Sequence, residues 1–420
     1  MKTRAALVLG WATCLAALPN ASQADEPLTL KVALHLHSTI SMGELAPQQI
    51  IELAARAGLD AVVLTESARR RWEYGVWPIR PLLRRVLEQP SVFTFGVERY
   101  LDTVRRLNHG PSGVITIAGL EVAPFYYWQR SPFDRRGGQI RNWHQHLLVL
   151  GLEDPRAIRQ LPLSEFDPYH GSQGARPSQQ LIDAVNAEGG LVFWAHPAAS
   201  HVEHYGSVEE FTEPYSYQLE LTTNYHGFAV ADENALPLVE PGAVWDRLLL
   251  SYCRGQRARP VWIVGELDWR GPQRPLDAVV TQVMAAERSP QAILAAFRAG
   301  KMWVVVRTRS VAPTLSRVTL TDIASGQSAT MGERITSTGP VRLHLSGGRG
   351  DVLTNPARVI VVKDGQVFAS QEVREPRLEL QWTDASPTHA GFYRVIIQDA
   401  SGLIYTNPIF VNPALSSSSP

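Results

Sequence analysis

Cysteine is scarce in this chain, which has 2 among 420 residues, at Cys14 and Cys253. A small disulfide-linked fold is therefore excluded, because such folds need several cysteine pairs. An excess of one charge is missing as well, since 40 Lys and Arg balance 40 Asp and Glu. This balance argues against a protein that binds nucleic acid over its whole surface, so no nucleic-acid partner is expected.

Long apolar runs are also rare, and the longest lies near the amino terminus at residues 5–18. About 14 apolar residues are fewer than the ~20 that a membrane-spanning helix needs. The run follows a short basic start and precedes a small-residue ending at Ala24, which is the layout of a secretory signal peptide. We therefore expect residues 1–24 to be removed from a periplasmic or secreted protein without an integral membrane span. Cys253 would then be the single remaining thiol.

Short apolar runs alternate with helical patterns over residues 25–311. Repeated strand–helix units predict a parallel sheet, and over this length a βα barrel is the economical way to close it. Strands are expected at residues 30–36, 61–65, 113–120, 146–150, 191–195, 217–221 and 260–264. Helices are expected at residues 47–57, 178–187 and 290–299. Active-site residues of such a barrel lie at the carboxyl ends of its strands.

The pattern changes after residue 309, where short alternating segments follow one another. Strands are expected at residues 317–321, 341–345, 358–363, 366–369, 377–382, 392–398 and 403–406. Between two of them, Asp364-Gly365 is typical of a two-residue hairpin turn. The sequence thus predicts an all-β sandwich domain over residues 312–412, followed by a tail at residues 413–420.

An arginine- and aromatic-rich stretch at about residues 67–112 interrupts the barrel pattern. We expect a helical insertion that follows the second strand and lies over the predicted site. Two roles stay open for it. One is a solvated lid whose arginines pair with acids, and the other is recognition of an anionic group or a membrane surface.

Candidate metal ligands stand at the ends of several predicted strands. His35 and His37 end the first strand, and residues two apart on a strand project to the same face. Further isolated ligand types adjoin other strands, namely Glu121, His146, His196 and Asp268. Histidine and carboxylate ligands from different strand ends are what a metal site at a barrel mouth requires. His144 is an alternative metal ligand to His146, because residues two apart on an extended segment lie on one face.

The order of these motifs resembles the PHP (polymerase and histidinol phosphatase) superfamily of metallohydrolases. The resemblance is carried by His35-Leu36-His37-Ser38, Gly119-Leu120-Glu121, His146, the segment 189–197 and Asp268. It implies a distorted (βα)7-type PHP barrel that holds up to three divalent metals and hydrolyses phosphate esters or, in some branches, carboxyl esters and amides. The carboxy-terminal strands resemble the carbaryl-hydrolase-type (CehA/McbA) branch.

Three positions depart from the family pattern, because Met42, Ser67 and Arg270 stand where metal ligands are usual. In the family these positions serve largely one metal, and the ligands of the other two are intact. The resemblance assigns the first metal to His35, His37, Glu121 and Asp268, and the second to Glu121, His146 and His196. We therefore predict a binuclear centre of Zn, Mn or Fe, with one of three family sites lost.

Two further residues are expected to take part in catalysis. Arg270 would hold a phosphate or a developing oxyanion in the vacated third position, or else is an ordinary surface arginine. Glu66 is either a substitute ligand or an acceptor that orients a ligand histidine. The predicted reaction is attack by a metal-bridging hydroxide on phosphorus or on a carbonyl carbon.

The leading interpretation is an exported metal-dependent hydrolase of a phosphoester, or of an aryl carboxyl ester or amide. Its small-molecule substrate is expected to be anionic, because of the arginines, or aromatic, because aromatic residues crowd the motifs. The alternative is a non-catalytic ligand- or envelope-binding protein with a degenerate PHP site. The sequence leaves the oligomeric state open.

Overall fold

The structure is a computed structural model that describes residues 27–76, 78–80, 82–163, 171–230, 236–309, 311–351, 355–385 and 387–414. The predicted signal peptide, with Cys14, lies outside the described residues, as does most of the predicted tail. Within the described ranges, every helix is too short or too polar to span a bilayer.

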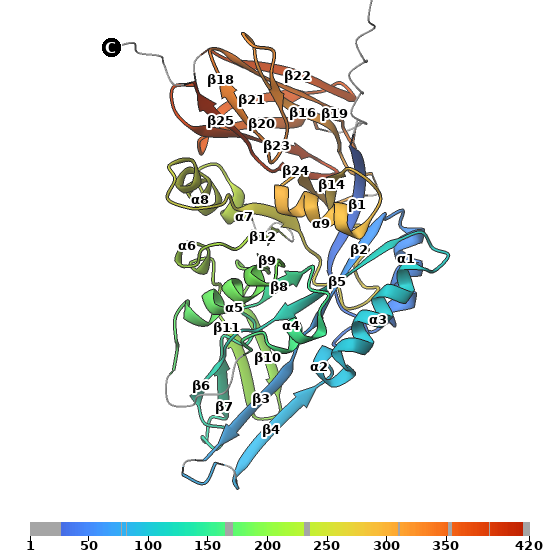
Figure 1. Ribbon diagram of the computed structural model, residues 1–420, viewed down its shortest axis with the longest axis vertical. Coiled ribbons are helices and arrows are strands. Elements are labelled where there is room, and N and C mark those ends of the chain that lie inside the picture. Colours follow the sequence, from blue (N-terminus) through green and yellow to red (C-terminus); the bar gives the residue numbers. More distant parts are fainter. Residues whose placement is uncertain are drawn as a thin grey trace, which may run out of the picture.

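A large mixed sheet runs through the middle of the molecule (Figure 1). Seven of its strands come from the first part of the chain: β1 (Leu28–Leu36), β2 (Ala61–Ser67), β5 (Ile115–Val122), β8 (Leu147–Leu150), β9 (Leu191–Trp194), β12 (Gly227–Val230) and β13 (Trp262–Gly265). They lie in this order, and neighbours are parallel except at β8, which is antiparallel to both β5 and β9. Strands β2, β8, β9, β12 and β13 are buried along their whole length, which explains their nearly continuous apolar sequences.

The two ends of this seven-stranded set are hydrogen-bonded to each other. After β13 the chain turns towards the end of β1, where Leu267 N donates to Leu34 O at 3.1 Å and Trp269 N donates to His35 O at 2.9 Å. A parallel bridge between Leu36 and Trp269 continues this contact. Because of it, the segment that carries Asp268 lies directly beside the segment that carries the histidine pair.

Nine helices are found in the described ranges: α1 (Pro47–Arg56), α2 (Val92–Phe95), α3 (Val97–Asn108), α4 (Pro155–Arg159), α5 (Arg176–Ala187), α6 (Gln218–Leu221), α7 (Leu236–Val239), α8 (Val244–Cys253) and α9 (Pro290–Ala299). The three helices predicted from the sequence are confirmed as α1, α5 and α9. Each has proline in its first turn, where a missing N–H costs nothing. Gly300 ends α9 with a φ of 70°, which glycine adopts without strain.

The predicted strand at residues 217–221 is wrong, because Gln218–Leu221 form the helical turn α6. Thr222 N donates to Gln218 O, which closes the turn. Five residues are too few to separate a period of two from a period of 3.6. The strand that stands between β9 and β13 is β12, a few residues later in the chain.

The later strands continue the large sheet and add a second one. β14 (Val279–Ala285) pairs with β1, and the sheet goes on through β15 (Met302–Arg307), β24 (Gly402–Thr406), β23 (Gly391–Asp399), β20 (Ala357–Lys363) and β21 (Gln366–Val373), with β18 (Arg334–Ser337) and β25 (Ile409–Pro413) at its side. A separate antiparallel sheet contains β17 (Ser328–Ala329), β16 (Thr314–Asp322), β19 (Val341–Gly348) and β22 (Arg377–Asp384). All seven strands expected after residue 309 are present. Asp364 and Gly365 both have positive φ, so the predicted hairpin turn is confirmed.

The insertion after β2 begins as a hairpin, so the prediction of a helical insertion is wrong for its first half. β3 (Arg70–Gly75) pairs with β4 (Arg84–Gln89), and only then do α2 and α3 follow. Trp72 and Tyr74 alternate with charged residues, which is the strand period. A separate apolar cluster holds the hairpin against a small sheet of β6 (Tyr127–Arg130), β7 (Gly138–Arg141), β10 (His201–Tyr205) and β11 (Val208–Thr212). The members of this cluster are Trp72, Tyr126, Trp128, Ile140, Trp143 and Val208.

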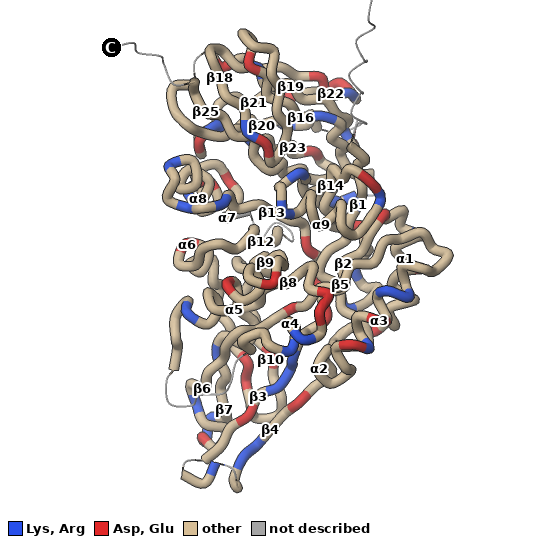
Figure 2. The backbone as a smooth tube through the Cα atoms, viewed as in Figure 1, with Lys and Arg blue, Asp and Glu red and all other residues tan. Residues whose placement is uncertain are grey.

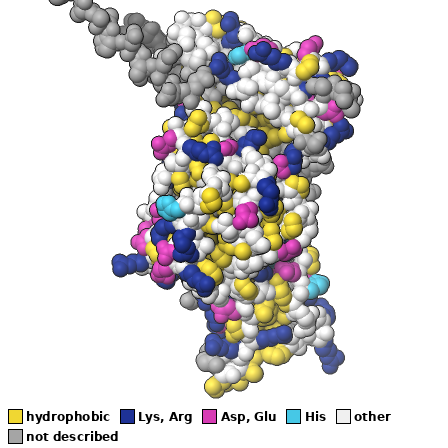
Figure 3. Space-filling view, turned by 90° about the vertical axis from the view of Figure 1, so that its right-hand side faces the viewer, with side chains coloured by type: hydrophobic (Ala, Val, Ile, Leu, Met, Phe, Trp, Pro, Cys, Tyr) yellow, Lys and Arg dark blue, Asp and Glu magenta, His cyan; other side chains and the backbone are white. Residues whose placement is uncertain are grey.

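Charged residues of both signs lie along this hairpin, as Figure 2 shows. Glu73 accepts hydrogen bonds from Arg71 at 2.8 Å and from Arg80 at 2.7 Å, so these two arginines pair with an acid. The turn of the hairpin exposes Ile79, Leu82 and Leu83. Figure 3 shows apolar side chains at the corresponding lower end of the molecule.

Candidate metal centre

Glu121, at the end of β5, stands at the centre of a group of histidines and is only 2% exposed. The predicted ligands meet here although they come from different strands. The nitrogens around its carboxylate are His146 Nδ1 at 2.5 Å, His35 Nε2 at 3.1 Å, His37 Nε2 at 3.5 Å and His196 Nε2 at 3.6 Å. Asp268 Oδ1 completes the group, 3.5 Å from His37 Nε2 and 3.8 Å from His35 Nε2.

These six residues form two overlapping groups whose possible ligand atoms lie within 4.8 Å of one another. The first group contains His35, His37, Glu121 and Asp268, and the second contains Glu121, His146 and His196. Only Glu121 belongs to both. The same division between a first and a second metal is what the family resemblance implies.

His146, and not His144, faces Glu121. The two rings lie 5.4 Å apart, and His144 points to the other side, where its Nε2 is 3.3 Å from Glu210 Oε2. The expectation that both histidines lie on one face is wrong, because the chain turns before β8, where Gln145 N donates to Asn142 O, and is not extended.

Burial disfavours charge on every group in this centre, but the groups act on one another. Burial alone raises the pKa of Glu121, yet His146 and His37 hold the pKa of this carboxyl well below its usual value. Burial lowers the pKa of His146, whereas Glu121 raises the pKa of His35 and of His196 despite their burial. Metal ligands are deprotonated carboxylates and neutral imidazoles, so a bound metal would displace protons from these rings.

The backbone is strained where three of the predicted ligands stand. Among the described residues, six that are not glycine have positive φ, and they include His35 at 68°, Asp268 at 43° and His196 at 27°. L-residues rarely adopt such angles, and they persist where neighbouring contacts impose them. At His35 the pairing of β1 with β2 also shifts register, which marks a bulge that redirects the side chain.

Glu266 is a functional residue that the sequence analysis missed. It is fully buried and accepts hydrogen bonds from His35 Nδ1 at 2.8 Å and from the backbone N of His196 at 2.6 Å. One carboxylate therefore fixes two predicted ligands from different strands. The sequence signal that could have revealed Glu266 is its position, since it follows a predicted strand and stands two residues before Asp268.

Glu66 lies outside both ligand groups. Its carboxylate accepts from Ser38 N at 2.9 Å and from the hydroxyls of Ser38 and Ser41, and Ser41 Oγ is 3.1 Å from His37 Nδ1. Glu66 is therefore connected to His37 only through the hydroxyl of Ser41. Ser67, one of the three departures from the family pattern, donates to Glu121 Oε2 at 3.2 Å.

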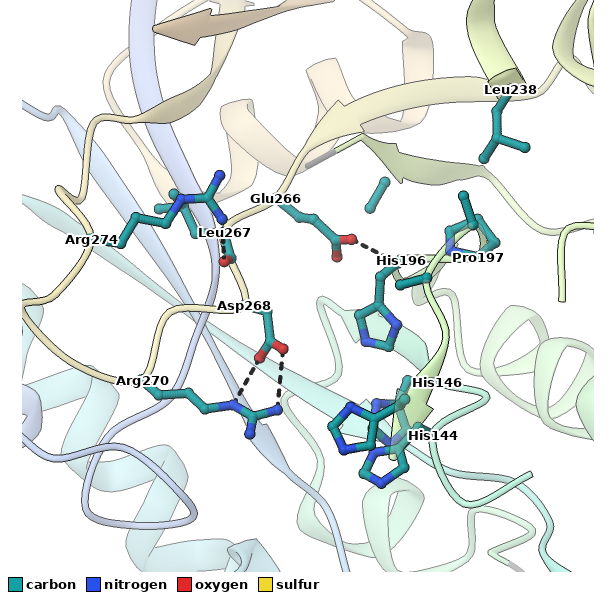
Figure 4. A pocket seen from close by; sticks show the side chains of 14 residues that line it. His144, His146, His196, Pro197, Leu238, Glu266, Leu267, Asp268, Arg270 and Arg274 are labelled. Atoms are coloured by element: carbon teal, nitrogen blue, oxygen red, sulfur yellow. Dashed lines mark hydrogen bonds and ion pairs between the residues drawn. The ribbon is translucent and has the colours of Figure 1, made fainter. Parts of the chain in front are cut away.

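A cavity of about 300 Å³ opens over this centre (Figure 4). Arg270 lies on one side of it and donates from Nε and NH2 to the two oxygens of Asp268, at 3.3 and 3.1 Å. The wall formed by Pro197, Ala198, Ala229, Leu238 and Leu267 is apolar. The cavity thus joins the buried carboxylate and histidines to a guanidinium and an apolar surface.

Comparison with known proteins gives weak matches. Neither a family model nor any curated protein matches the chain in sequence. A two-domain protein from Bacteroides vulgatus, containing a predicted PHP-like metal-dependent phosphoesterase, is 17% identical with a TM-score of 0.41, over 92% of this chain and 96% of its own.

Two further solved structures match over shorter parts of this chain. A Bifidobacterium adolescentis protein, named by inference as a metal-dependent phosphoesterase, is 14% identical with a TM-score of 0.32, over 60% of this chain and 91% of its own. An amidohydrolase from Chromobacterium violaceum, solved with sulfate and no metal, is 15% identical with a TM-score of 0.29, over 58% of this chain and 89% of its own. Scores this low do not establish a shared fold, so the functional argument rests on the geometry of the centre.

Proposed function

We propose that this protein is a metal-dependent hydrolase of the PHP type, with a binuclear centre around Glu121. The seven strands of the first part of the chain, whose ends are hydrogen-bonded together, would be the distorted (βα)7-type barrel. The strands after residue 312, in the large sheet and in the separate antiparallel sheet, would be the β-sandwich. The signal-peptide pattern of residues 1–24 supports export to the periplasm or beyond.

The observation that carries the proposal is a set of buried nitrogens without hydrogen bonds. In the described part of the chain, His37 Nε2 and His146 Nδ1 are shielded from solvent and make no hydrogen bond of good geometry, although His146 Nδ1 lies 2.5 Å from Glu121 Oε1. Leaving such groups unsatisfied costs free energy, and buried polar atoms are normally paired. Both nitrogens face Glu121, so a cation beside this carboxylate would satisfy them. The residues present therefore fit a metal.

His35, His37, Glu121 and Asp268 would hold one ion, and Glu121, His146 and His196 the other. Imidazole and carboxylate ligands suit Zn, Mn or Fe. Divalent metals in such centres activate water at neutral pH and polarise a phosphoryl or carbonyl oxygen. Around them, Glu266 holds the ring of His35 and the backbone N–H of His196, and the hydroxyl of Tyr215 lies 3.1 Å from His196 Nδ1.

The cavity favours hydrolysis of a phosphoester, because Arg270 places a guanidinium beside Asp268 at its edge. Its apolar wall favours the second candidate, an aryl ester or amide, since an aromatic group would fit against Pro197 and Leu238. Both reactions use the same centre, so they differ in the substrate and not in the metal ligands.

The test is the metal content of the mature protein, residues 25–420, after loading with Zn²⁺ or Mn²⁺. The double variant His35→Ala/His196→Ala should lose the metal held by the centre and the hydrolysis of p-nitrophenyl phosphate or p-nitrophenyl acetate. The matched control is His109→Ala/His204→Ala, which removes two exposed histidines and should keep both. A wild-type protein that holds no metal after loading would overturn the proposal and leave the non-catalytic binding protein.

A further inference from the structure

A second group of histidines and carboxylates lies beside the centre and shares no ligand with it. His144 comes from the segment before β8, and His201 and Glu203 come from β10, where residues two apart share a face. Glu210 on β11 stands opposite Glu203 in the pairing of these strands. The hairpin β10–β11 therefore presents three of these side chains to His144.

The separations match those of ligands around one ion. The possible ligand atoms of His144, His201 and Glu203 lie within 4.8 Å of one another. His201 Nε2 is 3.6 Å from Glu203 Oε2, and His144 Nε2 is 3.3 Å from Glu210 Oε2. Ligand atoms about 2.0–2.2 Å from a tetrahedral zinc lie roughly 3.3–3.6 Å apart.

These atoms are buried but unsatisfied. Within the residues that the structure describes, His144 Nε2, His201 Nε2 and Glu210 Oε2 make no hydrogen bond. His144 is 3% exposed and Glu210 is 1% exposed, so both groups are removed from bulk solvent. The two imidazole rings are tilted against each other, with centroids 3.4 Å apart. A dication would satisfy both nitrogens and both acids at once.

We infer that His144, His201 and Glu203, with Glu210 as the fourth ligand, form a further site for a Zn²⁺-type ion. It lies next to the proposed binuclear centre, because the rings of His144 and His146 are 5.4 Å apart. His144 and His201 also line the cavity, and Figure 4 shows His144 beside His146, away from Arg270. The ion would add positive charge to the side of the cavity that Arg270 does not reach.

The test counts Zn²⁺ per chain at a fixed free Zn²⁺ concentration, in folded protein checked by circular dichroism. The wild type should hold three equivalents, and His201→Ala/Glu203→Ala should hold two. The matched control is His204→Ala, an exposed histidine on the same strand, which should keep three. A His201→Ala/Glu203→Ala variant that binds as many equivalents as the wild type overturns the inference.

A second measurement separates this site from the proposed function. In His35→Ala/His196→Ala, one Co²⁺ equivalent should remain, with the visible absorption of a low-coordinate site, and adding Glu203→Gln should weaken its Kd at least tenfold. Glu203→Gln preserves size, so it guards against a failure to fold. If Glu203→Gln does not change the Kd of the remaining Co²⁺ equivalent, the inferred site of His144, His201 and Glu203 does not exist, whether or not the binuclear centre binds metal.

Discussion

The centre around Glu121 and the contact between α8 and β23 both bury charged side chains, but they differ in how those charges are balanced. At the second place, Arg394 donates from Nε and NH2 to the two oxygens of Asp246, at 2.7 and 2.8 Å. The ring of Trp245 lies 4.8 Å from the same guanidinium. Each charge there finds its opposite within the protein.

Around Glu121 the buried polar groups are not fully paired with one another. Four histidines surround one carboxylate, two of their nitrogens make no hydrogen bond to any described residue, and three ligand positions have strained φ angles. Arg394 Nη1 is also buried without a hydrogen bond, but its guanidinium is paired with Asp246. Around Glu121, by contrast, histidine nitrogens without hydrogen bonds stand on a strained backbone, and this combination indicates a ligand from outside. Burial alone would not separate the two places.

The largest effect is expected from Glu121→Gln, because this side chain belongs to both ligand groups. The variant should lose the metals of the binuclear centre and roughly a thousandfold or more in hydrolysis, since even one lost stabilising donor costs about 10²–10³ in rate. Metal analysis and initial rates check this. A Glu121→Gln protein that retains its full metal content would contradict the assignment of the bridging ligand.

Arg394→Met is expected to lower stability and not metal binding, because it leaves Asp246 buried without its partner. The variant should lose about 3–5 kcal/mol of unfolding free energy while its metal content stays unchanged. Denaturant unfolding measures this, and Arg377→Met is the matched control. Arg377 is 81% exposed and 3.5 Å from Glu379, so its loss should cost less than about 1 kcal/mol. If Arg394→Met lowers metal content as much as stability, the two places are not independent.

A smaller effect is expected from Arg270→Met, which should decide between the two substrate classes. If the guanidinium holds an anionic group, kcat/KM for p-nitrophenyl phosphate should fall about a hundredfold with metal content unchanged. The neutral p-nitrophenyl acetate should change far less. Arg270→Lys keeps the charge and should recover part of the loss. Equal losses on both substrates would show that Arg270 acts through Asp268 and does not bind the anion.

Much of this arrangement follows from local sequence. The buried strands have continuous apolar runs, and each predicted ligand stands at the end of one, so the meeting of His35, Glu121 and His196 follows from strand ends at one edge. The hairpin β3–β4 was missed because arginine and aromatic residues are also common in helices, and its tertiary partner is the distant β6–β7 sheet.

The remaining site residues depend on contacts that no local pattern contains. Glu266 gains its role because the chain after β13 returns to β1 and places its carboxylate against His35. His201 and Glu203 stand on a strand that alternates between half-buried and exposed residues, and no apolar run in the sequence marks a site there. Only the packing of that hairpin against His144 brings these side chains together.

The smallest effect is expected from Glu66→Gln, which alters the support of one ligand and not a ligand itself. Glu66 accepts from Ser41, and Ser41 Oγ lies 3.1 Å from His37 Nδ1, so the carboxylate orients the ring through a hydroxyl. Loss of such support typically costs 10–100-fold in metal affinity. We expect about a tenfold weaker Kd for the metal that His37 binds, with kcat nearly restored at saturating metal. Ser41→Ala breaks the same chain and should match it. A full loss of activity at saturating metal would instead make Glu66 a ligand, and a Kd equal to that of the wild type would remove it from the centre.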